Sequence, residues 1–227
     1  MINYWKAFWT RHAQATIDAH PQRQVLRTHH KEPISEELFD ILLKDIVEKL
    51  DLRSDDVVLD LCCGNGLITQ HIAPLCTSVI AVDFVQELVD QIDRKKHPNI
   101  YVFAQDIRRL RFGTSVFDKV MIYSGIQYLS LKETHSLFEA VMRWLRGDGL
   151  FFVGDIPDQD KLLRFFGAWE AGSGSVTREP PIIGTWFSAE WLEKLGRAVG
   201  FKRILILPQP KGTLNAHYRF DMIMRKG

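Results

Sequence analysis

Runs of apolar residues alternate with helical patterns along the central part of the chain. Five runs of largely apolar, β-branched character predict buried strands, at residues 57–61, 78–82, 100–104, 118–123 and 150–154. Three stretches between them keep a helical period, at residues 67–73, 85–94 and 131–146. Strands this apolar, separated by helices, predict a parallel sheet that helices cover on both faces.

The C-terminal part has a different pattern. It predicts a helix at 191–199 and two further strands at 202–207 and 218–224. Residues 208–217, between these strands, show no helical pattern, whereas a parallel pair would need a crossover connection. We therefore expect an antiparallel terminal pair, and an α/β fold with a Rossmann-like seven-stranded sheet that is mostly parallel and has an antiparallel last strand.

The N-terminal residues predict a helical segment that precedes the sheet. Residues 4–12 place Trp5, Phe8 and Trp9 on one helix face, because these positions are three or four residues apart. Such an aromatic stripe is typical of packing, and a lid over a ligand pocket is the alternative interpretation. We expect residues 1–33 to form an N-terminal helical lid segment.

A second helix and a long loop complete the predicted organisation. Ser35 is placed to cap a helix that keeps its period to about Leu50. Residues 167–186 contain Gly-Ser-Gly-Ser and Glu-Pro-Pro and predict a lid-like loop, since long loops in compact domains are often functional. We expect residues 34–227 to form a single domain.

Composition and charge argue against several classes of protein. Lys plus Arg number 29 and Asp plus Glu 28, so the net charge of +1 makes nucleic acid an unlikely partner. The three cysteines, two of them adjacent, form neither a disulfide framework nor the paired ligand spacing of a metal site, and we expect no metal. No apolar run is long enough for a signal-peptide core or a membrane span. We expect a cytoplasmic protein without a membrane partner.

An acid followed by a glycine turn comes directly after the first predicted strand. Asp60 ends the strand, and Gly64 and Gly66 let a ligand approach the backbone closely. Ligands of open α/β folds bind at this edge of the sheet. The carboxylate disfavours a pyrophosphate and favours the ammonium of an amino-acid moiety. The alternative interpretation is an ordinary strand-turn-helix connection.

Two further acids follow the next two predicted strands. Asp83 lies 23 positions beyond Asp60 and is placed to accept both hydroxyls of a ribose, with a helix N-cap as the alternative. Asp106 is placed to accept from an adenine amino group, although acids after strands commonly cap turns. Three acids at three successive strand ends predict a site for one adenosyl ligand.

The segment Asp60-Leu61-Cys62-Cys63-Gly64-Asn65-Gly66 resembles the first motif of class I S-adenosylmethionine-dependent methyltransferases, usually Asp-x-Gly-x-Gly-x-Gly. Cys62 replaces the first glycine, a variant similar to that of ubiquinone and menaquinone methyltransferases. The resemblance covers about 57–154 and implies S-adenosylmethionine as cofactor and S-adenosylhomocysteine as product. It implies cofactor contacts by Asp60, Cys62, Gly64, Gly66, Asp83, Phe84, Asp106, Ile107 and Tyr123.

Segments outside this core are similar to small methyltransferases of polysaccharide and sugar-nucleotide pathways. They are residues 33–37, 154–157 and 218–221. This similarity implies a small-molecule acceptor, methylated on oxygen or nitrogen, in the area of sugar or polysaccharide precursors.

Four residues are candidates for the acceptor side or for closing the site. His217 titrates near neutrality and is suited to deprotonate an acceptor, unless it is an exposed hairpin histidine. Asp155 is a similar candidate, with loop anchoring as the alternative, and Tyr128 is placed to orient an acceptor or to pack. Arg27 is suited to pair with the cofactor's carboxylate, unless it is solvated.

Two other functional classes remain open. An NAD-dependent oxidoreductase would require a third glycine after Gly64 and Gly66, where Leu67, Ile68 and Thr69 stand instead. A non-catalytic protein that binds S-adenosylmethionine would carry the same three acids, since they predict binding and not turnover.

Overall fold

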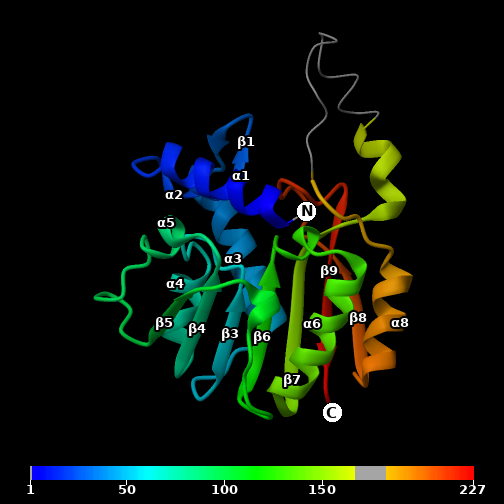
Figure 1. Cartoon of the computed structure of the whole chain (residues 1–227). Helices are drawn as coiled ribbons and strands as arrows, with labels where there is room; N and C mark the ends of the chain where they lie inside the picture. The colour runs from blue at the N-terminus through cyan, green and yellow to red at the C-terminus, as the bar shows by residue number, and fades with distance from the viewer. Residues whose placement is uncertain (1, 167–182) are drawn as a thin grey trace.

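A seven-stranded sheet in the order β5-β4-β3-β6-β7-β9-β8 forms the centre of the chain (Figure 1). The computed structural model describes residues 2–166 and 183–227. β9 runs antiparallel to the other six strands of this sheet, which are parallel to one another. The strands are β3 (Val57–Leu61), β4 (Ser78–Asp83), β5 (Ile100–Ala104), β6 (Phe117–Tyr123), β7 (Leu145–Pro157), β8 (Arg203–Pro208) and β9 (Arg219–Arg225). The predicted fold class is confirmed.

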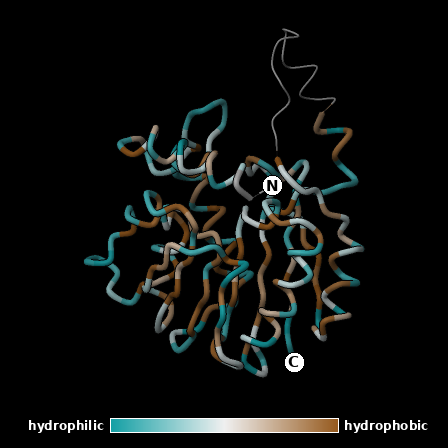
Figure 2. Tube along the Cα trace, in the orientation of Figure 1, coloured by the Kyte–Doolittle hydropathy of each residue, from teal (hydrophilic) through white to brown (hydrophobic). Residues whose placement is uncertain are grey.

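Helices cover both faces of the sheet, and the apolar residues lie between the layers (Figure 2). Side chains alternate along each strand, so Val58 belongs to the buried cluster that includes α3 and α4, whereas Leu59 belongs to the cluster that includes α6 and α8. The helices are α1 (Ile2–Ala15), α2 (Pro21–Gln24), α3 (Glu36–Leu50), α4 (Thr69–Ile72), α5 (Gln86–Val89), α6 (Leu131–Trp144) and α8 (Ala189–Val199). Short 3-10 turns are η1 (Ala73–Leu75), η2 (Ile107–Arg109), η3 (Ile126–Tyr128) and η4 (Gln159–Lys161), and β1 (Thr28–His29) pairs with β2 (Glu32–Pro33).

Serine hydroxyl groups cap the N-termini of the longer helices that pack on the sheet. The Ser35 hydroxyl accepts from the backbone N–H of Leu38, as the sequence predicts. Ser130 and Glu133 form a capping box at the start of α6, and Ser188 caps α8. Gly200 ends α8 with a φ of 111°, a conformation that glycine adopts at little cost.

Two predicted elements differ in extent. The helix expected at 85–94 is shorter: it ends at Val89, the backbone N–H groups of Gln91 and Ile92 then bond three residues back, and Asp93 turns the chain by accepting from the backbone of Lys95 and Lys96. Residues 147–149, between the predicted helix at 131–146 and the predicted strand at 150–154, lie inside β7, where residues 146–149 bulge out between the pairs Phe117–Leu145 and Lys119–Leu150. Neither difference changes the strand order.

The N-terminal segment lies across the edge of the sheet at which the parallel strands end (Figure 1). Ala13 of α1 packs on Val85 and Leu88 beside α5. The buried Asn65 donates to the carbonyl of Pro21 at 2.9 Å and to Oε1 of Gln24 at 2.8 Å. The segment therefore covers the glycine turn that follows β3. Of the predicted lid-like loop, residues 167–182 lie outside the described part of the chain.

Candidate functional site

A cavity of about 470 Å³ opens at the carboxyl ends of the central strands. Strand order fixes the order of its lining, from Asp83 at β4 through Asp60 at β3 and Tyr123 at β6 to Asp155 in β7 and Arg219 at the start of β9. Neighbouring strands are about 4.8 Å apart, so these positions span roughly 19 Å. The cavity suits an elongated ligand.

Ten of the predicted site residues line this cavity, and three do not. Those that line it are Arg27, Asp60, Cys62, Gly64, Asp83, Phe84, Tyr123, Tyr128, Asp155 and His217. Gly66 packs instead against Ile92, which a Cβ at this position would approach to 2.6 Å. Asp106 and Ile107 line a separate groove beside α6.

Asp60 is a buried acid whose hydrogen-bond partner is neutral. It is 2% exposed, and its Oδ2 accepts from the Thr69 hydroxyl at 2.6 Å. Burial, opposed by the Thr69 hydrogen bond and reinforced by Asp83, raises the pKa of Asp60 to about 7. A cationic group of a ligand would therefore stabilise its ionised form.

Asp83 is also buried, and two backbone N–H groups fix its orientation. Its Oδ2 accepts from Gly64 and its Oδ1 from Val85, both at 3.0 Å. Burial raises the pKa of Asp83 to about 6 despite these hydrogen bonds. Each carboxylate oxygen has a further lone pair with which to accept from a hydroxyl.

The turn after β3 brings its backbone close to the N-terminal segment. Gly64 has a φ of 57°, and a Cβ there would lie 2.9 Å from Cγ1 of Val25. Cys62 also adopts a left-handed conformation, with a φ of 60°, and such non-glycine positions cluster at functional sites. The cysteine thus keeps a glycine-like backbone at the cavity.

The carboxylate of Asp106 is bound by Arg108, which follows it by two residues. Arg108 donates to both carboxylate oxygens, with Nε at 2.9 Å from Oδ1 and Nη2 at 2.5 Å from Oδ2. Burial opposes ionisation, but Arg108 holds the pKa of Asp106 below its usual value. Its contact with an adenine stays a prediction, and such a contact would share the carboxylate with Arg108.

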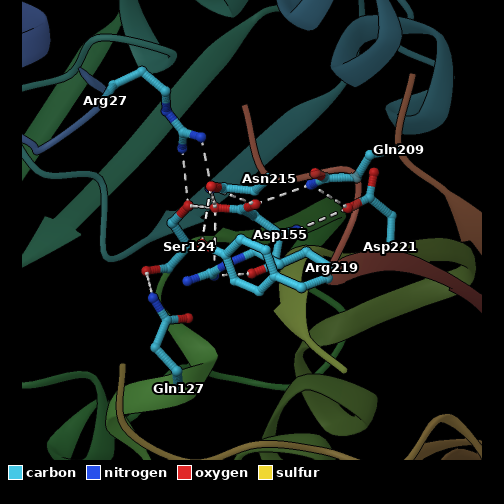
Figure 3. A network of polar contacts seen from close by, with 9 residues as sticks. Arg27, Ser124, Gln127, Asp155, Gln209, Asn215, Arg219 and Asp221 are labelled. Carbon is cyan, nitrogen blue, oxygen red and sulfur yellow. Dashed lines mark hydrogen bonds and ion pairs between the residues drawn. The ribbon is translucent and has the colours of Figure 1, made fainter. Parts of the chain in front are cut away.

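Asp155 is the centre of a buried polar network at the other end of the cavity (Figure 3). Arg27 and Arg219 reach its Oδ2 from two sides, at 3.5 and 3.4 Å. The Ser124 hydroxyl also donates to Oδ2, and Gln209 Nε2 donates to Oδ1 at 3.0 Å. Burial alone would raise the pKa of Asp155, but Arg219, Arg27 and these hydrogen bonds lower it to about 2. The carboxylate is therefore ionised at neutral pH.

A β-bulge turns Asp155 into this network. Between the pairs Val153–Met222 and Ile156–Phe220, Gly154 and Asp155 of β7 lie opposite a single residue of β9, Asp221. Asp155 has a φ of 60°, and its backbone N–H donates to Asp221 Oδ1 at 2.8 Å. Asp221 is in turn paired with Lys49 of α3 at 2.6 Å. The bulge is thus held by a second, fully buried acid.

Four buried side-chain atoms in the described part of the chain have no hydrogen-bond partner, and all belong to residues that line the cavity. They are Trp9 Nε1, Tyr123 Oη, Gln127 Oε1 and Arg219 Nε. Buried polar groups are almost always paired, because an unpaired one costs about 1–3 kcal/mol. Their position favours a ligand as the missing partner.

Tyr128 and His217 border the same end of the cavity. Tyr128 lies 4.7 Å from Trp5 and 6.0 Å from Trp9 between ring centroids, and burial raises its pKa to about 12. The aromatic stripe of α1 thus packs, and Trp9 also lines the cavity. His217 stands edge-on to Tyr218, and partial burial together with Lys161 lowers its pKa. It is neutral at neutral pH and able to accept a proton.

Sequence reasoning missed several polar partners in this network: Ser124, Gln127, Gln209, Asn215 and Arg219. Arg219 had a signal in the sequence, since Arg219 and Asp221 are two charged residues within a strand that continues as Met-Ile-Met, and charged residues are rarely buried without a partner. The other residues come from three separate segments, at 124–127, 209 and 215. The bulge at Asp155 brings them together.

Comparison with known proteins gives a consistent result. Residues 58–149 match the family described as methyltransferase domain. An uncharacterized methyltransferase of Schizosaccharomyces pombe is 30% identical over 116 residues, which cover 46% of this chain and 40% of that protein. The demethylmenaquinone methyltransferase of Lactobacillus johnsonii is 29% identical over 204 residues, covering 80% of this chain and 82% of that one.

A similar solved structure is the Haemonchus contortus phosphoethanolamine N-methyltransferase 1 in complex with phosphoethanolamine and S-adenosylhomocysteine. The TM-score is 0.75 at 17% identity, and the match covers 98% of this chain and 48% of that one. The chain therefore spans under half the length of this protein and of the S. pombe relative. At 17% sequence identity, this similarity shows a shared fold only.

Proposed function

We propose that this protein, which has the class I methyltransferase fold and carries a methyltransferase domain at residues 58–149, methylates a small-molecule acceptor with S-adenosylmethionine. The observation that carries the proposal is the pair of buried acids, Asp60 and Asp83, at adjacent strand ends. Neither has a cationic partner among the described residues, and both have a raised pKa.

The cavity fits S-adenosylmethionine by its chemistry. Asp60 is suited to its ammonium group, and Asp83 to its ribose hydroxyls. Arg27 is suited to the carboxylate of the cofactor, because it belongs to the segment that covers Gly64 and its guanidinium lies over the Tyr123 ring at 5.1 Å. When bound, the cofactor supplies a methyl group on a sulfonium, and the carbon–sulfur electron pair stays on sulfur as the acceptor's lone pair bonds the methyl carbon.

The protein's own part is alignment and water exclusion. Tyr128, under Trp5 and Trp9, is placed to orient the acceptor. His217 is suited to take the proton that a hydroxyl or ammonium acceptor must lose. Asp155 is a poor base with a pKa of about 2, and we assign it the positioning of Arg27 and Arg219.

The enclosure of the site favours a small acceptor. Trp9 of α1 and Phe165 line the cavity together with the strand ends. Because the flanking segments are similar to methyltransferases of polysaccharide and sugar-nucleotide pathways, we propose a sugar or polysaccharide precursor as this acceptor. No helix among the described residues is long and apolar enough to cross a membrane.

Calorimetry with S-adenosylhomocysteine tests the cofactor assignment. We expect the wild type to bind it and Asp83→Asn to bind it at least about tenfold more weakly, since the ribose hydroxyls lose a charged acceptor. Asp90→Asn is the matched control, because Asp90 is exposed directly after α5 and, among the side chains of the described residues, accepts only from the exposed Gln86. Stabilisation by NAD but not by S-adenosylhomocysteine would instead support an oxidoreductase.

Turnover needs a separate measurement. The full chain is incubated with methyl-labelled S-adenosylmethionine and pools of small metabolites, and the gained methyl group is detected by mass. We expect S-adenosylhomocysteine to accumulate with at least one pool. Tight binding without release in any pool would favour a non-catalytic binding protein.

A further inference from the structure

We infer that the acceptor carries an anionic group with at least two oxygens, a carboxylate or a phosphoryl group, and that Arg219 binds it. The inference rests on the proposed methyltransferase function and names the class of its acceptor.

One edge of the Arg219 guanidinium is left unused. The side chain is 8% exposed, and its Nη1 donates to the carbonyl oxygen of Asp155 at 2.5 Å. Its Nε is buried and without a partner among the described residues. Arginine pairs best with oxyanions through two parallel N–H groups, and Nε belongs to such an edge. A ligand with two acceptor oxygens would satisfy it.

The buried charges around Arg219 leave a positive surplus. Arg27 and Arg219 share one carboxylate, that of Asp155. Asp221, next to this group, is already paired with Lys49 at 2.6 Å. Lys49 also pairs with Asp45, so the surplus lies at the cavity itself, where two guanidinium groups face the single carboxylate of Asp155. A buried charge without a counterion is costly, so anions are favoured at this end of the cavity. The cofactor's carboxylate at Arg27 would leave Asp155 to Arg219, whose Nε still has no partner among the described residues.

The two arginines lie at different points along the sheet edge. Arg27 contacts Ser124 after β6 at 2.8 Å, on the side of Asp60 and Gly64. Arg219 opens β9, two strands further along, and lies over the Tyr218 ring at 5.2 Å. Arg27 thus suits the cofactor's carboxylate, and Arg219 suits a second anion. Asn215 and His217 border this second position.

Thermal unfolding of the full chain saturated with S-adenosylhomocysteine tests the inference. The probes are methylphosphonate and acetate, compared with ethanolamine and glycerol at constant ionic strength. We expect one of the two anions to raise the unfolding temperature saturably, and the cation and neutral probe to leave it unchanged. Which anion acts distinguishes a phosphoryl from a carboxylate acceptor. Equal effects of all four probes would overturn the inference.

Variants connect the effect to Arg219. Arg219→Lys keeps the charge but loses the paired N–H edge, so we expect the anion to bind about tenfold more weakly. Asn215→Asp places a negative charge beside the site and is expected to weaken it similarly, which covers a failure of Arg219→Lys to fold. Arg146→Lys is the control, since Arg146 pairs with Asp118 at the other end of β6.

Calorimetry of S-adenosylhomocysteine separates the two proposals. If the wild type does not bind it, the proposed function fails before the anions are tested. If it binds and neither anion stabilises, only the present inference fails. Competition between the anion and S-adenosylhomocysteine would place the anion at Arg27 and would also overturn the assignment to Arg219.

Discussion

The backbone N–H of Asp155 donates to the carboxylate of Asp221 at 2.8 Å, so one buried acid holds the chain that presents another. Asp221 is fully buried, and its second oxygen accepts from Lys49 of α3 at 2.6 Å. Burial raises the pKa of Asp221, opposed by Lys49, whereas two arginines keep Asp155 ionised. A helix on one face of the sheet is thereby coupled to the charged network of the cavity.

Asp221→Asn is expected to lower the free energy of unfolding by about 1–3 kcal/mol, because it replaces a charged partner of a buried ammonium by a neutral amide. Chemical denaturation measures this change. Asp45→Asn is the matched control, since Asp45 is the other, more exposed partner of Lys49 and is expected to cost less than about 1 kcal/mol. Equal losses in the two variants would contradict a special role of Asp221.

Binding of S-adenosylhomocysteine is expected to weaken as the pH falls from 8 to 6. The ligand's ammonium requires ionised Asp60, whose pKa is about 7 in the ligand-free chain, so binding below pH 7 must release a proton. Affinity should fall up to about tenfold over this range. Calorimetry in buffers of different ionisation enthalpy counts the proton. Asp60→Asn should bind weakly and without this pH dependence; a wild-type affinity that is flat with pH would exclude the assignment.

The ligand-free protein should itself become less stable between about pH 4 and pH 7. The pKa of Asp60 is about 7 in the folded chain against an ordinary value of 3.8, so the folded state holds more protons across this window. Stability then falls as pH rises. Asp155 has the opposite sign, because its pKa is about 2 and its contribution is lost below pH 4. Denaturation of Asp60→Asn should show a flatter profile than wild type between pH 4 and pH 7, and identical slopes would contradict this account.

Local patterns in the sequence predict the acids of the cofactor end well, because each follows a buried strand and parallel strands end at one edge. Asp60 and Asp83 lie in the cavity for this reason. Asp106 follows the same rule, but it lies outside the cavity lining, and Arg108, two residues later, binds its carboxylate. A contact of this kind depends on side-chain conformation and is not encoded in strand periodicity.

The network around Asp155 was beyond sequence reasoning for a different reason. A single β-bulge sets which side of β7 the carboxylate faces; a glycine such as Gly154 often marks a bulge, but it does not indicate which groups Asp155 then meets. Arg27, Ser124, Gln209 and Arg219 then meet there from distant positions. Non-local pairing of this sort follows from the register of β9 on β7.

Gly154→Ala is expected to destabilise the fold and to move Tyr123. A Cβ at this position would lie 2.6 Å from Cε2 of the Tyr123 ring, over which Arg27 is stacked. Overpacking of this kind costs about 1–3 kcal/mol. Gly147→Ala in the same strand is the control, since a Cβ there meets nothing within 4 Å. Denaturation should separate the two variants, and similar stabilities would show that the ring yields freely.

Asn65→Ala is expected to release the N-terminal segment from the glycine turn. Asn65 joins the two through bonds to Pro21 and Gln24, and its loss leaves the buried Gln24 amide oxygen without this donor. Hydrogen exchange at residues 21–28 should accelerate, and S-adenosylhomocysteine should bind more weakly because Arg27 lies on the same segment. Asn99→Ala is the matched control: Asn99 also donates to backbone carbonyls, of Ala73 and Cys76, but away from the cavity. It should cost stability without changing exchange at residues 21–28 or ligand affinity. If Asn65→Ala also left both unchanged, the segment would be held by the packing of α1 on α5 rather than by this asparagine.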